Sequence, residues 1–142
     1  MKEDTINRVI EQALSWVGTP YHPCARIKGA GVDCGMLLIE VFADAGACSR
    51  FDPGSYRPDW HLHRSEELYL GHVLDYFDEV PLDQAKPGDA LVYKYGRTWS
   101  HGAILVAPGR VVHAYIKLGV IISNLDEHPL AGRTPRAFTL KE

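Results

Sequence analysis

The sequence predicts a single α+β domain in which helices come first and an antiparallel sheet follows. Apolar residues in the first half recur with the period of an amphipathic helix. After Pro87-Gly88 the period shortens to that of strands, and Gly and Pro separate short segments rich in Val, Ile, Ala and Tyr. Helices followed by a run of strands are typical of α+β proteins. The 142 residues contain no repeat or linker, so we expect one domain over 1–142.

The first expected helix covers 6–17, where Ile, Val, Ala and Leu form one apolar stripe. Asp4 or Thr5 can cap its N-terminus, and Gly18, with a proline two positions later, ends it. The stretch 18–31 contains three Gly and two Pro, and we expect it to be a loop.

A second helix is expected to begin near Cys34 and to lie in the centre of the domain. Asp33 occupies the N-cap position, and Gly46 the position of a C-terminal glycine. Between them, 36–45 is apolar on almost every side, which indicates a helix that is buried all round. A third helix is expected over roughly 65–77, where apolar residues share one face.

The second half predicts a sheet of about five short strands joined by turns. Pro108-Gly109 and Leu118-Gly119 mark two of these turns. The expected strands are 91–95, 101–107, 110–116, 119–124 and 136–140. Because short turns join neighbouring strands in opposite directions, we expect the C-terminal sheet to be antiparallel.

The charge balance is weakly acidic, with 15 Lys+Arg against 18 Asp+Glu and a net charge of -3. Proteins that bind nucleic acid through its phosphates normally present a basic face, so this balance argues against that class. No apolar run approaches the roughly 20 residues of a membrane-spanning helix. The first residues, Met1-Lys-Glu-Asp4, lack the basic and then apolar order of a signal peptide, and we expect synthesis in the cytoplasm.

The cysteines indicate free thiols. Cys24, Cys34 and Cys48 are an odd number and cannot form a closed disulfide framework. Without an export signal, reduced thiols are expected. The spacings contain no C-x-x-C, so neither a zinc ribbon nor a redox dithiol is predicted. We expect Cys24 and Cys48 to be structural.

Cys34 is the candidate nucleophile. It occupies the first turn of the expected second helix, directly after Asp33. Unpaired backbone N–H groups and the positive end of the helix favour a thiolate at such a position. The same N–H groups can bind the oxyanion of an acyl intermediate. A free cysteine is also commonly a small buried apolar residue, and position alone leaves both interpretations open.

Two histidines on neighbouring expected strands are candidate partners for a nucleophile. His101 opens one apolar strand, and His113 lies within the next. Single histidines at such positions are usually structural. A plain two-residue turn at Pro108-Gly109 would place the two side chains on opposite faces of the sheet. A Cys-His-His site therefore requires an odd-length loop or a bulge around 107–110.

Five short motifs extend over most of the chain. In order they are Gly18-Thr-Pro-Tyr21, Gly31-Val-Asp-Cys-Gly35, Pro87-Gly-Asp89, Ser100-His-Gly-Ala-Ile104 and Val111-Val-His-Ala114. Their set and order resemble the NlpC/P60 family of papain-like cysteine peptidases. The likeness is strongest to the branch of phage cell wall peptidases found in phage tails and gene transfer agents. The stretch 59–67 resembles that branch as well.

The resemblance implies a papain-like fold, with the nucleophile at the start of a helix that packs on the sheet, and it implies residue roles. Cys34 matches the nucleophile, His101 the general base and His113 the residue that orients the base. Gly35 stands where most relatives have Ser, and the loop after Tyr21 lacks the usual Trp-Gly-Gly. The residues assigned to oxyanion and substrate binding are Tyr21, Asp33 and Gly35.

The implied activity is hydrolysis of peptide bonds in peptidoglycan stem peptides, typically between D-γ-glutamyl and diaminopimelate, without metal or organic cofactor. The implied partners are peptidoglycan peptides and phage tail proteins, with action at the bacterial cell wall. His61 and His63 lie beside two glutamates but lack further ligands at a spacing that suits a metal.

Two other functions stay open. An acyltransferase or amidase of the same architecture would pass the acyl group from Cys34 to another acceptor. A structural phage-tail protein would keep the fold with an inactive site. Tyr93, Tyr95 and Trp99 either line a ligand groove or pack within the sheet.

Overall fold

The computed structural model describes residues 3–23, 25–47, 75–95 and 98–141. Several expectations lie outside these ranges. The residues concerned are most of the third helix (65–74), the stretch 59–67, His61, His63, Cys24 and Cys48.

Two α-helices precede a series of strands, as the sequence predicts. The helices are α1 (Glu3–Ser15) and α2 (Cys34–Asp44), and a short 3-10 helix, η1, covers Leu82–Gln84. The strands are β1 (Arg26–Ile27), β2 (Gly31–Val32), β3 (Phe77–Val80), β4 (Ala90–Tyr95), β5 (Thr98–Ala107), β6 (Arg110–Tyr115), β7 (Gly119–Asn124) and β8 (Arg136–Leu140). The α+β class is confirmed, with two helices packed on an antiparallel sheet.

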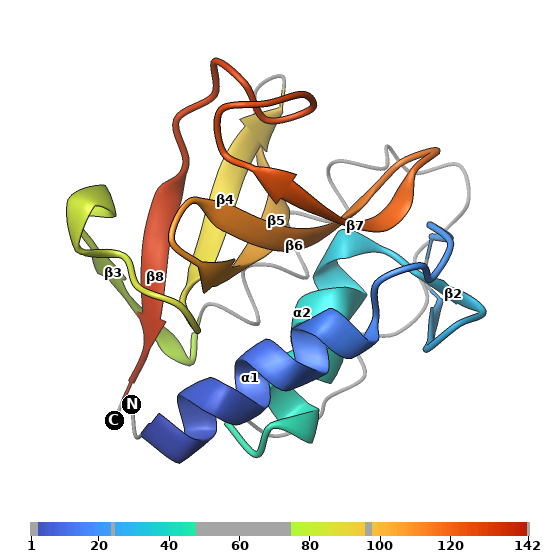
Figure 1. The fold of residues 1–142 in the computed structure, drawn as a ribbon, viewed down its shortest axis with the longest axis horizontal. Coiled ribbons are helices and arrows are strands. Elements are labelled where there is room, and N and C mark those ends of the chain that lie inside the picture. Colours follow the sequence, from blue (N-terminus) through green and yellow to red (C-terminus); the bar gives the residue numbers. More distant parts are fainter. Residues whose placement is uncertain (1–2, 24, 48–74, 96–97, 142) are drawn as a thin grey trace.

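The main sheet has six strands in the order β3-β8-β4-β5-β6-β7, and every neighbouring pair is antiparallel. α1 and α2 pack against each other; α1 also contacts β5, and α2 contacts β5 and β6. Figure 1 shows the two helices side by side, with the main sheet on the other side of the molecule. β1 and β2 form a separate small hairpin before α2.

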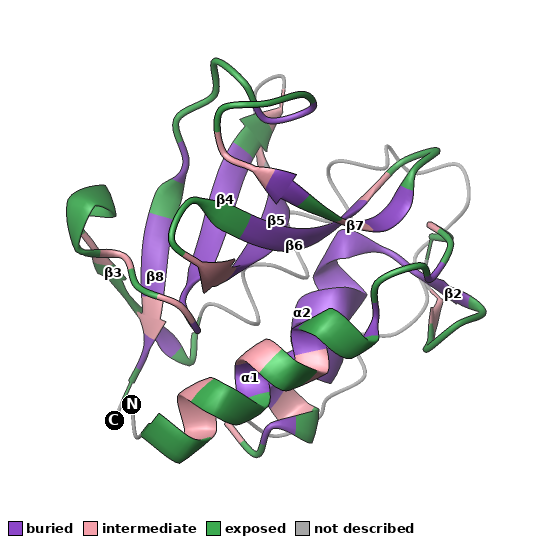
Figure 2. Cartoon of the chain, viewed as in Figure 1, coloured by how far each residue is buried: buried purple, intermediate pink, exposed green. Residues whose placement is uncertain are grey.

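The burial of the two helices follows their sequence patterns. α1 buries only Val9 and Ala13 and is amphipathic, whereas every residue of α2 from Cys34 to Phe42 is buried (Figure 2). The one carboxylate in this buried stretch is Glu40, whose Oε1 accepts a hydrogen bond from Nε of Arg26 at 2.7 Å. This ion pair joins the small hairpin to α2.

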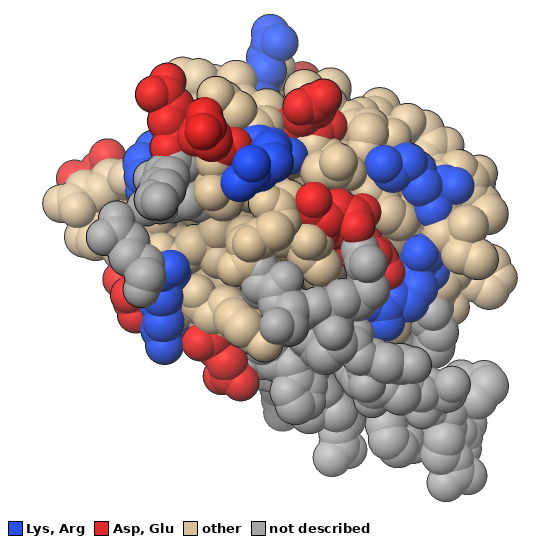
Figure 3. All heavy atoms as spheres, turned by 90° about the horizontal axis from the view of Figure 1, so that it is seen from below, with Lys and Arg blue, Asp and Glu red and all other residues tan. Residues whose placement is uncertain are grey.

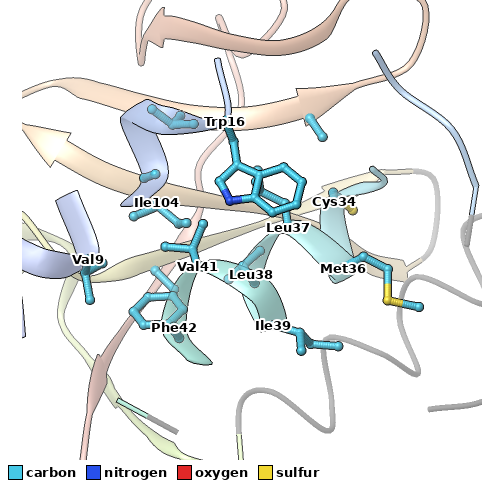
Figure 4. Packing of buried hydrophobic residues seen from close by; sticks show 14 of the residues in the cluster. Val9, Trp16, Cys34, Met36, Leu37, Leu38, Ile39, Val41, Phe42 and Ile104 are labelled. Atoms are coloured by element: carbon cyan, nitrogen blue, oxygen red, sulfur yellow. The ribbon is translucent and has the colours of Figure 1, made fainter. Parts of the chain in front are cut away.

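The central core is formed where α2 meets α1 and the sheet. Figure 4 shows the large side chains of this cluster, with the sulfur of Cys34 at the beginning of α2. The labelled members that α1, α2 and β5 contribute are Val9, Cys34, Met36, Leu37, Leu38, Ile39, Val41, Phe42 and Ile104. A second cluster contains alternate residues of β4 and β5, among them Leu91, Tyr93 and Ala103, together with Val111 of β6.

The β5–β6 hairpin contains the bulge that a shared histidine face requires. Ala107 pairs with Arg110, so the turn at 108–109 has two residues, but Leu105 pairs with Val111. Val106 is therefore an extra residue, and it shifts the register of the rest of the hairpin by one. The condition derived from the sequence is confirmed, because this shift brings His101 and His113 to the same face.

Two elements differ from the sequence prediction. Phe77 was expected in the third helix but begins β3, which pairs with β8 and adds a sixth strand to the expected sheet of about five. Its ring packs edge-on against Phe42 at 5.0 Å between centroids, so core packing can fix Phe77 in a strand as well as in a helix. The expected loop 18–31 contains β1 and the first residue of β2, since Arg26 and Val32 pair across a tight turn.

Within the described ranges, no helix combines the length and the apolar character needed to cross a bilayer. On the face shown in Figure 3, acidic and basic side chains are interspersed rather than gathered by sign. The described residues of that face therefore form no basic stripe of the kind that binds phosphates.

Candidate active site

Asp33 fixes the start of α2 and thereby the position of Cys34. Its backbone is extended, and its Oδ1 accepts a hydrogen bond from the N–H of Met36 at 2.9 Å. The predicted N-cap is confirmed. Cys34 is the first residue of the helix and has 0% of its surface exposed, and Gly35 after it is also buried. The thiol thus lies at the positive end of a buried helix.

Tyr21 is held beside the residues that lead into α2. The N–H of Val32 donates to the carbonyl of Pro20, and the N–H of His22 donates to the carbonyl of Val32, both at 3.0 Å. These two bonds form a parallel bridge between Tyr21 and Val32. The ring of Tyr21 is half-buried and packs against the cluster that contains Cys34. Tyr21 thus lies at the margin of the same core cluster, next to the strand that leads into α2.

The loop that carries Tyr21 is also attached to β7. Gly18 donates its N–H to the carbonyl of Val120 at 3.0 Å, and Val120 donates its own to the carbonyl of Thr19 at 2.8 Å. Gly119 has a φ of +78°, and a Cβ there would lie 2.6 Å from the Thr19 oxygen. A side chain at this position would collide with the loop, which explains why glycine stands here.

His101 and His113 form a hydrogen-bonded pair. Nε2 of His101 lies 2.8 Å from Nδ1 of His113, and the rings meet edge to face with centroids 5.0 Å apart. Nε2 of His113 lies 2.8 Å from Oγ of Ser123 on β7. All three side chains are buried. Three neighbouring strands therefore contribute one continuous line of hydrogen bonds.

Tyrosines surround His101. The rings of Tyr95, Tyr115 and Tyr93 lie at 5.3, 5.6 and 6.3 Å from its centroid. Burial raises the pKa of Tyr93 to about 12 and raises the pKa of Tyr95 further, so both phenols are uncharged at neutral pH. The guanidinium of Arg133 stacks on Tyr95 at 3.8 Å. Tyr93 and Tyr95 therefore pack within the sheet against His101, while Trp99 packs against the core cluster that contains Cys34.

Burial also determines the charge of His113. It lowers the pKa of this imidazole from 6.5 to about 4, because the charged form is poorly solvated inside the protein. At neutral pH His113 is therefore a neutral ring with one N–H and one lone pair. Such a ring can accept a hydrogen bond from His101 and orient it, but it carries no positive charge.

Ser123 is the site residue that the sequence analysis missed. It follows three apolar residues of β7, Val120, Ile121 and Ile122, and only 2% of its surface is exposed. A serine at this place in a strand could have indicated a polar partner on a neighbouring strand, because a buried hydroxyl needs a hydrogen-bond partner. The partner depends on the β6–β7 register, in which His113 faces Ile121 and Ser123 is the diagonal neighbour.

No group of three or more His, Cys, Asp or Glu side chains is arranged to hold a metal ion within the described ranges.

The site consists of two parts in the structure. One is the start of α2 with Cys34, Asp33 and Tyr21, and the other is the line of His101 and His113 on the sheet. α2 contacts both strands of the second part, β5 and β6.

The two helices, the antiparallel sheet and the cysteine at the start of the buried helix define the papain-like class of folds. Within that class the chain belongs to the NlpC/P60 family, whose family model matches residues 15–138.

A curated relative is the Escherichia coli protein named murein DD-endopeptidase MepS/murein LD-carboxypeptidase. It is 25% identical over 124 residues, which is 87% of this chain and 57% of the relative. The chain thus spans little more than half the length of the curated relatives it matches.

Solved structures share the fold. The NlpC/p60 domain of the peptidoglycan hydrolase SagA has a TM-score of 0.65 and 21% identity, covering 95% of this chain and 98% of that one. NlpC1 from Trichomonas vaginalis has a TM-score of 0.70 and 12% identity, covering 97% and 44%. RipD from Mycobacterium tuberculosis, described as a non-catalytic NlpC/p60 domain protein, has a TM-score of 0.64 and 21% identity, covering 97% and 98%.

Proposed function

We propose that the protein is a cysteine endopeptidase that hydrolyses peptide bonds of peptidoglycan stem peptides, with Cys34 as nucleophile and His101 as general base. The observation that supports it most is the hydrogen bond between His101 and His113 on the strands that α2 contacts. Family membership supports it as well, as does the murein endopeptidase named among the relatives. The bond we propose is the one between D-γ-glutamyl and diaminopimelate.

The residues support an acyl-enzyme mechanism. The Cys34 thiolate attacks the carbonyl carbon, and the backbone N–H groups at the start of α2, with Tyr21, stabilise the oxyanion. His101 gives its proton to the leaving amine as the C–N bond breaks, which leaves a thioester. It then takes a proton from water, the water attacks the thioester, and Cys34 is released. His113 holds the ring of His101 in place throughout.

A mass-spectrometric assay tests this proposal. Purified Gram-negative murein is incubated with the wild type and with Cys34→Ala, whose folding is checked by circular dichroism. We expect new stem-peptide fragments with the wild type alone, and their masses identify the bond. Loss at the D-Glu–diaminopimelate bond supports our assignment, whereas fragments from D,D-cross-links would assign the bond named for the E. coli relative.

The same assay distinguishes hydrolysis from acyl transfer. With an added amine such as glycinamide, a hydrolase gives mainly free acids and an acyltransferase gives mainly amides. Products that are chiefly amides at low amine concentration would replace our proposal with the transferase.

A second candidate function is peptidoglycan binding without hydrolysis. The observation that favours it is the complete burial of Cys34, since a nucleophile must be reached by its substrate. RipD, with the same fold, is described as adapted to peptidoglycan binding. Pull-down with insoluble murein separates the candidates: binding that is equal in the wild type and Cys34→Ala, with no new fragments, would favour this function.

We also propose that the protein reaches the cell wall as part of a phage or prophage tail, after synthesis in the cytoplasm. The likeness of the motifs to the tail-associated branch of the family supports this proposal. Purified particles from the bacterium that encodes the chain should contain it in tail fractions after head–tail separation. Its absence from all particle fractions would contradict the proposal.

A further inference from the structure

Ser123 lies at the inner end of the hydrogen-bond line that begins at His101. Its Oγ is 2.8 Å from Nε2 of His113, and it is buried on β7. In the part of the chain that the structure describes, the ring nitrogens of His113 bond to two side chains, His101 on one side and Ser123 on the other. The proposed mechanism so far gives Ser123 no role.

We propose that Ser123 is a positioning residue: its hydroxyl oxygen accepts the Nε2–H of His113 and thereby keeps the lone pair of His113 Nδ1 directed at His101. This inference rests on the proposed function, because it assigns the direction of each hydrogen bond from the proton that His101 must carry. Ser123 itself touches neither substrate nor reacting atoms.

The direction follows from counting protons. When His101 holds the proton for the leaving amine, both of its ring nitrogens carry hydrogen, so its Nε2–H must donate to Nδ1 of His113. His113 is neutral in its buried position and has a single N–H. That hydrogen is therefore on Nε2, and Ser123 accepts it.

The opposite arrangement is incompatible with catalysis. If the Ser123 hydroxyl donated to Nε2, His113 would carry its hydrogen on Nδ1, facing His101. Protonation of His101 would then place two N–H groups opposite each other at 2.8 Å. The acceptor role of Ser123 thus selects the tautomer of His113 that allows His101 to become doubly protonated.

Nitrogen NMR of protein labelled with 15N-histidine tests the tautomer directly. In the wild type we expect Nε2 of His113 to resonate as a protonated nitrogen and Nδ1 as an unprotonated one. Ser123→Thr retains the hydroxyl and should preserve this pattern. Ser123→Ala should move the two resonances toward each other, because both tautomers become populated. Unchanged resonances in Ser123→Ala would overturn the inference.

Two further variants make the test robust. Ser123→Cys has nearly the same size but a weak acceptor, so it should reproduce the shift even if Ser123→Ala does not fold. Thr139→Val removes a hydroxyl from β8, where it bonds to Lys86, and should leave the His113 resonances unchanged. A shift in Thr139→Val as large as in Ser123→Cys would show a general structural effect and overturn the inference.

Kinetics add a second measurement. With a murein peptide as substrate, Ser123→Ala should lower kcat roughly ten-fold, the change that corresponds to the loss of one hydrogen bond, with KM unchanged. Ser123→Thr, which retains the hydroxyl, should have a kcat close to that of the wild type. If the wild type cleaves no murein, the proposed function fails, but the NMR result still decides the role of Ser123. An unchanged kcat in Ser123→Ala would overturn that role.

Discussion

His113 owes its chemical character to burial more than to its neighbours. It stands within an apolar strand, and desolvation alone accounts for its lowered pKa of about 4. Its two hydrogen bonds satisfy both ring nitrogens, so the ring is neutral without leaving a buried polar group unpaired. A neutral histidine is a better orienting partner here than a charged one, because it can accept from His101.

The same burial makes the stability of the protein depend on pH. The unfolded chain has a His113 pKa near 6.5 and the folded chain about 4, so between these values the unfolded state binds more protons. The free energy of unfolding should therefore fall as the pH is lowered through this window, by about 3 kcal/mol from this group. Below about pH 4, His113 contributes no further loss.

Urea unfolding of the wild type and His113→Asn at pH 7 and pH 4 measures this effect. The variant lacks the buried imidazole, so the stability difference between the two proteins should shift by about 3 kcal/mol in favour of the variant at the lower pH. A difference that stays constant would show that His113 titrates alike in both states.

Substitutions of His113 separate orientation from nucleophilic attack. In His113→Asn the amide oxygen can still accept from His101, whereas His113→Leu offers no acceptor. We expect kcat to fall about ten-fold in the first and about a hundred-fold in the second, while Cys34→Ala removes activity. Cleavage of a stem peptide by folded variants provides the measurement. Equal and complete losses in His113→Asn and Cys34→Ala would contradict the orienting role.

At the residue scale the sequence predicted the parts that depend on local pattern. The Asp33 cap could be derived from local pattern, and the spacing of His101 and His113 gave the condition for a shared face. Whether the hairpin contains the bulge at Val106 that meets this condition could not be derived from the sequence. Ser123 could not, because its partner depends on which residue of β7 faces which residue of β6. The burial that sets the charge of His113 depends likewise on contacts between distant segments.

Among the elements, α2 and the strands β4 to β8 lie within a few residues of their predicted bounds, because period and turn residues agree there. β3 was missed for a physical reason. It is a short strand at the edge of the sheet, and its one buried residue, Phe77, has no alternating apolar neighbour that would indicate a strand. Edge strands of this kind are fixed by pairing rather than by local pattern.

The contact between β7 and the Tyr21 loop leads to a prediction about Gly119. An alanine there would require a left-handed backbone with a side chain and would also place Cβ against the Thr19 carbonyl. We expect Gly119→Ala to lower the free energy of unfolding by about 3 kcal/mol and to reduce activity by displacing Tyr21. Thermal or urea unfolding and the murein assay measure the two effects.

Gly109 provides the matched control. Its φ of +73° is nearly the same, but nothing lies within 4 Å of the position of a Cβ. Gly109→Ala should therefore lower the free energy of unfolding only through its left-handed backbone, by about 1 kcal/mol, and leave activity unchanged. Equal losses of stability in the two variants would show that the contact with Thr19 contributes nothing.

For the molecule as a whole, the complete burial of the nucleophile makes access the first requirement for activity. Cys34 has no exposed surface, and both histidines are buried. A reagent or substrate can reach the sulfur only if neighbouring side chains move. The size of a thiol reagent should therefore affect its rate with Cys34 far more than with an exposed thiol.

Alkylation in a Cys24→Ser/Cys48→Ser background measures this access. We expect iodoacetamide to modify native Cys34 and a polymer-linked maleimide to do so much more slowly, with both rates rising in urea. Cys34→Ala/Ser15→Cys in the same background carries an exposed thiol as the control, and should react with both reagents at native rates close to those in urea. If both reagents modified native Cys34 as fast as they modify the control thiol, the buried position would be contradicted.

Both parts of the site depend on the position of β7. Val120 holds the loop that carries Tyr21, and three residues later Ser123 meets His113. A slide of β7 by two residues along β6 would keep its apolar side chains on the same face, and the sheet would lose little. Both attachments would be broken at once, however. Because one edge strand holds both attachments, a change in its register would displace Tyr21 and release Ser123 from His113 together. Neither part of the site could then be restored while the other stayed displaced.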